Sequence, residues 1–275
     1  METVKKSPQT DFEEFKEAIT NENKTSLFPT NVVELPSKGF LYQEDNLLSL
    51  GTVEMKFMTA KEENILTTES YIKQGIVIDK FLQSMVIGPK FNYDSLLIGD
   101  KDALVVASRI YGYGEIYPIE VETPSGKKQK VEIDLTTLKS KEVDEDLFTK
   151  GENRFFYETP LGKNRLEFKL LTVGDQKKID EKLKKYKKAG DPDTQISSRL
   201  STMIISVDGN SDPHFIELFI ANDLRSRDSR SFREYIASIS PGVDMEIELV
   251  DEDTLEPFRS KVAIGADFFW PDIRV

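Results

Sequence analysis

The chain has 275 residues, with 37 Lys and Arg against 49 Asp and Glu, one His and no Cys, and its formal net charge is −12. The lack of cysteine excludes disulfides, thiolate zinc sites, iron–sulfur clusters and cysteine nucleophiles. The acidic balance argues against sequence-independent binding to nucleic-acid phosphates. With no apolar run near the ~20 residues of a membrane span and no apolar signal core at the N-terminus, we expect a soluble cytosolic protein.

Residues 1–30 are polar, and we expect a flexible N-terminal arm. Within it Phe12, Phe15 and Ile19 form one short apolar stripe at helical spacing, and Asp11 stands where an N-cap stabilises the first turn. An isolated helix of this length is marginal in water. Two interpretations stay open, because the stripe either docks on its own domain or orders on a partner chain. The three apolar residues are therefore candidate interaction residues.

The first folded elements are two strands and a helix. Residues 32–35 form an apolar run, and residues 52–57 alternate apolar and charged side chains as a half-buried strand does. Thr59 and Glu62 have the spacing of a capping box, which predicts a helix from Ala60 to about Thr67. Residues 68–110 add further helical stretches, and we expect Asp100 to cap the last of them.

Three β-hairpins are expected after this helical part. Residues 117–122 and 130–135 alternate and flank Thr123-Pro124-Ser125-Gly126, whose proline and glycine suit a type I turn. A similar pattern, with the turn at residues 159–162, follows about 36 residues later. The third pair encloses the acidic tip Asp251-Glu252-Asp253, which we expect to be a solvated turn.

Helices separate the second and third hairpins. The first opens near Thr172 and carries the one basic patch of the chain, formed by Lys177, Lys178, Lys182, Lys184, Lys185, Lys187 and Lys188. This patch is read as a solvated helix face, as a contact for an acidic partner, or as a nucleic-acid contact. Pro213 suits the first position of a further helix, and Asp228 is expected to cap the last one.

No constellation of catalytic residues stands out. There is no glycine-rich phosphate loop and no metal-ligand pattern, and His214 stands at a helix start without a partner motif. We therefore expect no enzymatic activity, no cofactor and no metal site. Near the C-terminus Phe268, Phe269 and Trp270 have two interpretations, core closure or contact with a partner.

These patterns predict an α+β fold, mainly helical in its first half and built of hairpins and helices in its second. The expected organisation is a flexible arm over residues 1–30, an α+β region with the first hairpin over residues 31–150, and an α+β region with the second and third hairpins over residues 151–275.

Several stretches carry a family resemblance when they are taken in order. They are residues 34–42 (ELPSKGFLY), 58–66 (MTAKEENIL), 73–79 (KQGIVID), 100–102 (DKD) and 268–271 (FFWP). Together they resemble the baseplate proteins of T-even-like bacteriophages, in particular the hub subunit and hub-assembly proteins. The resemblance spans roughly residues 31–271. Relatives often carry Cys-x-x-Cys pairs at hairpin tips, whereas the tips here contain none, so a metal site is not expected.

The resemblance implies a structural or assembly component of the baseplate hub that acts through protein–protein contacts. Its implied partners are other baseplate or tail proteins, such as hub, spike or tape measure, and self-association stays open. Its implied location is the virion tail, and the host cytoplasm during assembly. Two alternatives remain: an assembly chaperone for the hub or tape measure that is absent from the mature virion, and a nucleic-acid-binding accessory protein that uses the helix at residues 177–188.

Overall fold

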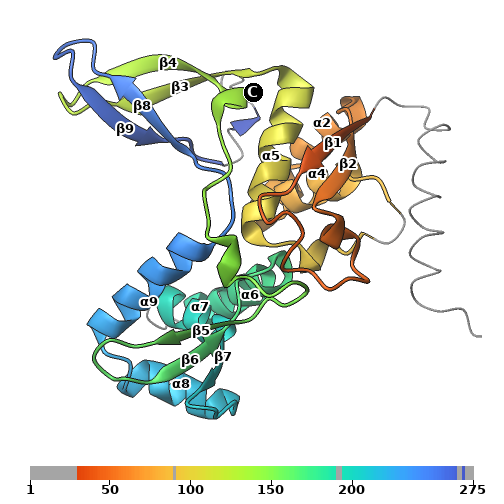
Figure 1. Ribbon diagram of the computed structural model, residues 1–275. Helices are drawn as coiled ribbons and strands as arrows, with labels where there is room; N and C mark the ends of the chain where they lie inside the picture. The colour runs from red at the N-terminus through yellow and green to blue at the C-terminus, as the bar shows by residue number, and fades with distance from the viewer. Residues whose placement is uncertain (1–29, 89–90, 190–193, 265–267, 270–275) are drawn as a thin grey trace, which may run out of the picture.

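The computed structural model describes residues 30–88, 91–189, 194–264 and 268–269, and it confirms an α+β fold (Figure 1). The arm at residues 1–29, including Phe12, Phe15 and Ile19, lies outside the described residues, as does Trp270. Three groups of elements are visible in Figure 1: a mainly helical group that follows the arm, a pair of long hairpins, and a three-stranded sheet with its own helices.

The first group combines one antiparallel strand pair with four helices. β1 (Thr30–Glu34) pairs with β2 (Thr52–Lys56), so that Thr30 lies opposite Lys56. The helices are α2 (Ala60–Leu66), α3 (Glu69–Gln74), α4 (Val77–Met85) and α5 (Ile98–Tyr113). The capping box is confirmed, because the Thr59 amide donates to the Glu62 carboxylate at 3.1 Å and α2 begins at Ala60.

The two long hairpins come from distant parts of the chain and lie against each other (Figure 1). They are β3 (Ile116–Glu122) with β4 (Lys128–Asp134), and β8 (Glu246–Val250) with β9 (Pro257–Lys261). In the first hairpin the Gly126 amide donates to the Thr123 carbonyl at 2.9 Å, which closes the predicted turn. The Gln129 side chain donates to the Val250 carbonyl at 3.1 Å. Contacts between these hairpins therefore cross the boundary that the sequence suggested at residue 150.

The third group is a sheet in the order β5–β6–β7 with four helices. The strands are β5 (Phe155–Glu158), β6 (Arg165–Phe168) and β7 (Ile204–Val207), all antiparallel to their neighbours. The helices are α6 (Val173–Ala189), α7 (Gln195–Met203), α8 (Pro213–Asn222) and α9 (Ser226–Ile239). Pro213 occupies the first turn of α8 as predicted, and the Asp212 side chain caps the helix by accepting from the His214 amide at 3.2 Å.

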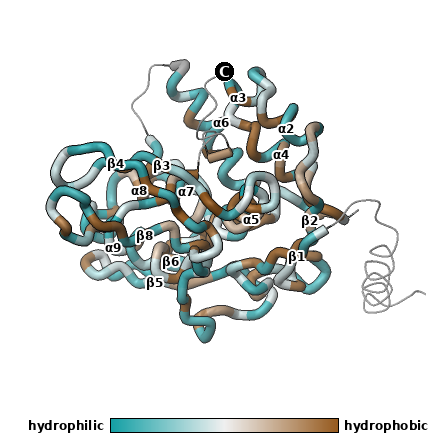
Figure 2. The backbone as a smooth tube through the Cα atoms, turned by 90° about the horizontal axis from the view of Figure 1, so that it is seen from above, coloured by the Kyte–Doolittle hydropathy of each residue, from teal (hydrophilic) through white to brown (hydrophobic). Residues whose placement is uncertain are grey.

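Short 3₁₀ turns fill several connections between these elements: Leu47–Leu50, Tyr93–Ser95, Leu135–Thr137 and Glu145–Leu147. The main hydrophobic core extends through all three groups, and α5 is its central helix, with Leu104 and Val105 fully buried. Apolar stretches of the backbone trace gather around α5 in Figure 2, whereas the outer parts of the hairpins are largely hydrophilic. Burial of this apolar surface is the principal stabilising contribution.

Two aspartates that the sequence assigned to helix caps have other roles. The N-caps of α5 and α9 are Leu97 and Arg225, and both Asp100 and Asp228 lie inside the first turn, buried. Asp228 accepts hydrogen bonds from the backbone amides of residues 161 and 162, at 2.8 and 3.0 Å, in the tight turn between β5 and β6. The cap predictions were wrong because tertiary partners use these carboxylates, which local sequence does not reveal.

The acidic tip of the third hairpin also differs from the expectation. Asp251 is fully buried and accepts a hydrogen bond from the Ser125 amide at 3.2 Å, while Asp253 pairs with Lys127 at 2.8 Å. The prediction of a solvated turn was therefore wrong for Asp251, because the first hairpin covers this carboxylate.

Candidate functional site

The most developed concave site is a groove where the first turn of α5 meets α7 and α9. Its volume is about 490 Å³, within the range of roughly 300 to 1,000 Å³ that is usual for binding pockets. We call it the α7–α9 groove and define it by the side chains that face it: Ile98, Asp102, Lys141, Leu171, Ile196, Arg199, Met203, Arg233, Ile236 and Ala237.

The floor of the groove is apolar. Leu171 and Met203 are buried in a small hydrophobic cluster, separate from the main core, on which Ile98 and Ile236 also pack. Ile196, on the first turn of α7, is 51% exposed. The folded chain therefore leaves the Ile196 side chain open to solvent, in a concavity and beside this apolar floor.

Positive charge accompanies this apolar floor. Arg199 donates from Nη1 to the Gln176 side-chain oxygen at 2.8 Å, and Arg233 donates from Nε to the Ser229 carbonyl at 3.3 Å. Both guanidinium groups thus bind neutral acceptors in the described part of the chain. Lys141 adds a third cation at the same groove. An acidic partner would meet two arginine charges that pair with no carboxylate among the described residues.

One acidic group, Asp102 on α5, faces the groove. Burial raises the pKa of Asp102, and the charges of Lys101, Lys141 and Lys261 oppose this effect. Three cations and one partly buried carboxylate give the groove a positive balance, in contrast to the net negative charge of the whole chain.

One end of the groove is closed by a very close backbone approach. A Cβ atom on Gly99 would lie 1.9 Å from the Pro241 carbonyl oxygen, so no larger residue fits there without movement of the backbone. The Lys141 amide donates to the Gly242 carbonyl at 2.8 Å beside this contact. The loop after α9 is thereby fixed against the start of α5.

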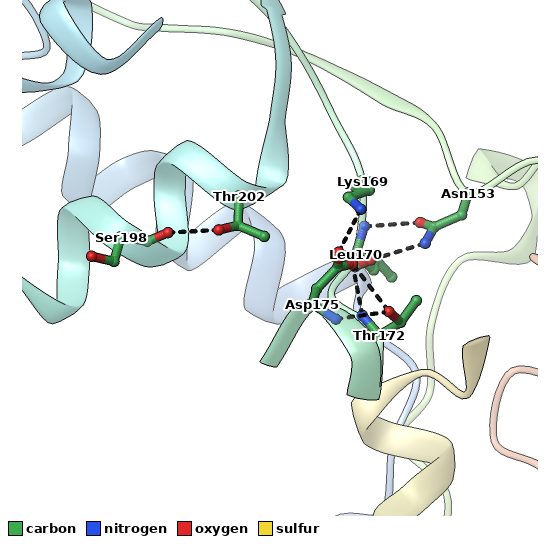
Figure 3. A network of polar contacts seen from close by, with 7 residues as sticks. All are labelled: Asn153, Lys169, Leu170, Thr172, Asp175, Ser198 and Thr202. Carbon is green, nitrogen blue, oxygen red and sulfur yellow. Dashed lines mark hydrogen bonds and ion pairs between the residues drawn. The ribbon is translucent and has the colours of Figure 1, made fainter. Parts of the chain in front are cut away.

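A network of polar contacts fixes the wall of the groove between β6 and α6 (Figure 3). The Asn153 side chain accepts from the Leu170 amide at 2.8 Å and donates to the Leu170 carbonyl at 2.9 Å. Asp175 accepts from Lys169 at 2.8 Å and from the Thr172 amide at 3.2 Å. Because both backbone groups of Leu170 are satisfied, this wall is held in one conformation.

A second polar cluster lies near the groove but is closed to solvent. Asp100 is fully buried and accepts from the Ser37 hydroxyl at 2.6 Å and from the Tyr42 hydroxyl at 2.5 Å. Burial raises the pKa of Asp100, although the hydrogen bonds from Ser37 and Tyr42 oppose it. The cluster ties the loop after β1 to α5, and its burial and complete hydrogen bonding indicate a structural role.

Two of the aromatic residues singled out near the C-terminus lie in the core. Phe268 and Phe269 are 0% and 1% exposed, and their rings contact Tyr117 and Phe81, each with 4.9 Å between centroids. The buried Arg109 donates from Nε to the Phe268 carbonyl at 3.1 Å. This placement corresponds to core closure, one of the two interpretations that the sequence left open.

The basic face of α6 is partly engaged by the chain itself. Lys182 pairs with Glu217 at 2.7 Å, Lys177 pairs with Asp94 at 2.5 Å, and the Lys184 ammonium donates to the Gln74 carbonyl at 3.1 Å. These contacts join α6 to α8 and to the first group of elements. They account for part of the basic patch as structural.

No group of three or more His, Asp or Glu side chains suited to a metal ion occurs among the described residues. In the same part of the chain, no helix has the length and apolar character needed to cross a membrane.

The sequence did not indicate the α7–α9 groove. The sequence leaves residues 196–207 as a helix or a strand and places Ile236 on the last helix. Only the packing of α7 against α9 and α5 shows which apolar positions stay open. Sequence patterns that could have pointed to it are Arg199 following Ile196 by three residues and Arg233 preceding Ile236 by three, because this spacing puts a cation and an apolar side chain on one helix face.

Comparison with known proteins adds no relative. No protein-family model, no curated protein and no solved structure matches this chain.

Proposed function

We propose that this chain is a structural or assembly component of the baseplate hub of a contractile phage tail, and that it acts through protein–protein contacts. The observation that carries the proposal is the α7–α9 groove, where Ile196 is 51% exposed beside Arg199 and Arg233. An open apolar floor with charged side chains beside it is typical of surfaces that bind other proteins. The resemblance to T-even-like baseplate proteins supplies the setting and the implied partners, which are hub, spike or tape-measure proteins.

The alternative in nucleic-acid binding has less support. A phosphate backbone at α6 would compete with Asp94 for Lys177 and with Glu217 for Lys182. The hydrogen bond that Lys182 donates to Glu217 raises the pKa of Lys182. The net charge of −12 opposes such binding over the rest of the surface.

The composition of purified particles tests the proposal. Mass spectrometry of virions and of purified tail-assembly intermediates should detect the chain in both if it is a structural subunit. Its presence in intermediates but not in virions would instead support the assembly chaperone. Its absence from both, under conditions where other baseplate proteins are detected, would contradict a role in the hub.

A further inference from the structure

The chemistry of the α7–α9 groove defines what it should bind. A ligand that complements the apolar floor has an apolar stripe. A ligand that also complements Arg199, Arg233 and Lys141 has acidic residues beside that stripe. A helix of two to three turns with large apolar side chains at positions i, i+3 and i+7 has this form, and it is a common occupant of protein grooves.

The chain contains one such segment outside the described residues. Residues 11–19 read DFEEFKEAI, with Phe12, Phe15 and Ile19 at helical spacing. The same nine residues carry four carboxylates and a single lysine. The carboxylates belong to Asp11, Glu13, Glu14 and Glu17. The segment therefore matches the groove both in its apolar stripe and in the sign of its charge.

The length of the connecting chain allows contact within one molecule. Ten residues, 20–29, separate Ile19 from the start of β1, and when extended they span up to about 35 Å. The seven steps of chain from Thr30 to Ser37 span at most about 25 Å. Ser37 is hydrogen-bonded to Asp100, one residue from the groove wall at Gly99. The end of the groove at Gly99 thus lies within the length of the extended linker.

The other concave surfaces fit this segment less well. The hollow between β4 and β8 has a volume of about 440 Å³ and is lined by carboxylates, namely Glu132, Asp134, Asp244, Glu246 and Glu248. It would repel a segment with four acidic residues. Another hollow, of about 580 Å³, is lined by one cation, Arg154, which pairs with Glu167, and by a second carboxylate, Glu152. Its negative balance would not attract a segment with four acidic residues.

We infer that the α7–α9 groove is the docking site of residues 11–19 of the same chain, with Phe12, Phe15 and Ile19 on its apolar floor and the acidic residues toward Arg199 and Arg233. A partner that binds the same groove must displace the arm. This consequence rests on the proposed function, in which the groove binds another protein. The arm then competes with that partner for the groove.

The first test is competition in solution, with the full-length chain throughout. The probe is a labelled peptide of residues 9–22, and its binding is followed by fluorescence anisotropy. The receptor is either the unaltered chain or the variant Phe12→Ala, Phe15→Ala, Ile19→Ala. A tethered arm has an effective concentration of about millimolar, so the variant should bind the peptide at least about tenfold more tightly. Equal affinity for both receptors, or no binding to the variant, would overturn the inference.

The second test locates the arm directly and uses the lack of native cysteine. Thr20→Cys is combined with Ala237→Cys in the groove, or with Thr254→Cys on the exposed third hairpin as a control, and a short bismaleimide is added. We expect faster cross-linking to residue 237, within a monomer, and a marked loss of it when Arg199→Glu and Arg233→Glu are added. Equal rates for both pairs would contradict the inference. Cross-linked dimers in place of monomers would show that a second copy occupies the groove, which also overturns it. Unchanged circular dichroism shows that the variants are folded.

Discussion

Buried carboxylates join segments of this chain that lie far apart in sequence. Asp100 connects α5 to the loop after β1, Asp228 connects α9 to the turn of the second hairpin, and Asp251 connects the third hairpin to the first. Each accepts backbone or hydroxyl donors rather than pairing with a cation in the contacts described above. Loss of any one of these acceptors would leave its donors without a partner in the contacts given above.

Asp100 should give the free energy of unfolding a distinctive pH dependence. Because burial raises its pKa above the ordinary value of 3.8 in the folded chain, its contribution is complete below pH 3.8 and is lost as the pH rises through the raised pKa. Urea unfolding of the chain and of Asp100→Asn across this range isolates the effect. As the pH rises, we expect the free energy of unfolding of the unaltered chain to fall relative to that of Asp100→Asn. A difference that does not change with pH would contradict a raised pKa.

Phe268 should contribute strongly to stability, because its ring is fully buried against Tyr117. Truncating a buried phenylalanine to alanine costs about 3–5 kcal/mol, so Phe268→Ala should lower the free energy of unfolding by this amount. Phe215→Ala is the matched control, since Phe215 is 39% exposed on α8, and its cost should be well below that of Phe268→Ala. Urea titration of both variants measures the difference. Similar small costs for the two would mean that Phe268 is not part of the core.

At the scale of elements, the close contact between α5 and the loop after α9 shapes the groove. Gly99 and Gly112 belong to the same helix, yet an added Cβ meets different neighbours. At Gly99 it meets the Pro241 carbonyl oxygen at 1.9 Å, whereas at Gly112 it meets the terminal methyl of Met58 at 2.0 Å. A flexible side chain moves aside easily, but a backbone carbonyl does not.

These two glycines form a matched pair of substitutions. Gly99→Ala should destabilise the chain by about 1–3 kcal/mol through overpacking. Gly112→Ala should be close to neutral or stabilise by up to about 1 kcal/mol, because alanine favours the helix. Thermal and urea unfolding of both variants checks the order. A Gly99→Ala variant as stable as Gly112→Ala would show that the contact with Pro241 does not constrain α5.

Local chemistry made several of these elements predictable. The Thr59 and Glu62 capping box and the turn at Thr123–Gly126 involve residues within four positions of one another, so the sequence contains all the partners. The α+β class followed because segments with helical spacing and segments with strand-like alternation both occur along the chain. The groove could not be predicted in this way, because residues between 97 and 243 line it and only tertiary packing brings them together. The same reason explains the wrong cap assignments of Asp100 and Asp228.

At the scale of the whole molecule, charge is distributed unevenly. The hollow between the first and third hairpins is acidic, whereas the α7–α9 groove has a positive balance within a chain of net charge −12. Such separation favours one orientation of a charged partner over others and speeds association at low salt. It suits a component that must bind partners in a fixed arrangement.

The central claim is that the α7–α9 groove is used in assembly, and complementation tests it most directly. A phage that lacks the gene for this chain is supplied with the unaltered chain or with the groove variant Arg199→Glu plus Arg233→Glu. The control is Arg227→Glu plus Lys80→Glu, which changes the net charge by the same amount outside the groove. The measurement is the yield of infectious particles with complete tails, at equal levels of folded protein. We expect the control to restore the yield and the groove variant to fail. A groove variant that restores the yield as well as the unaltered chain would contradict the claim.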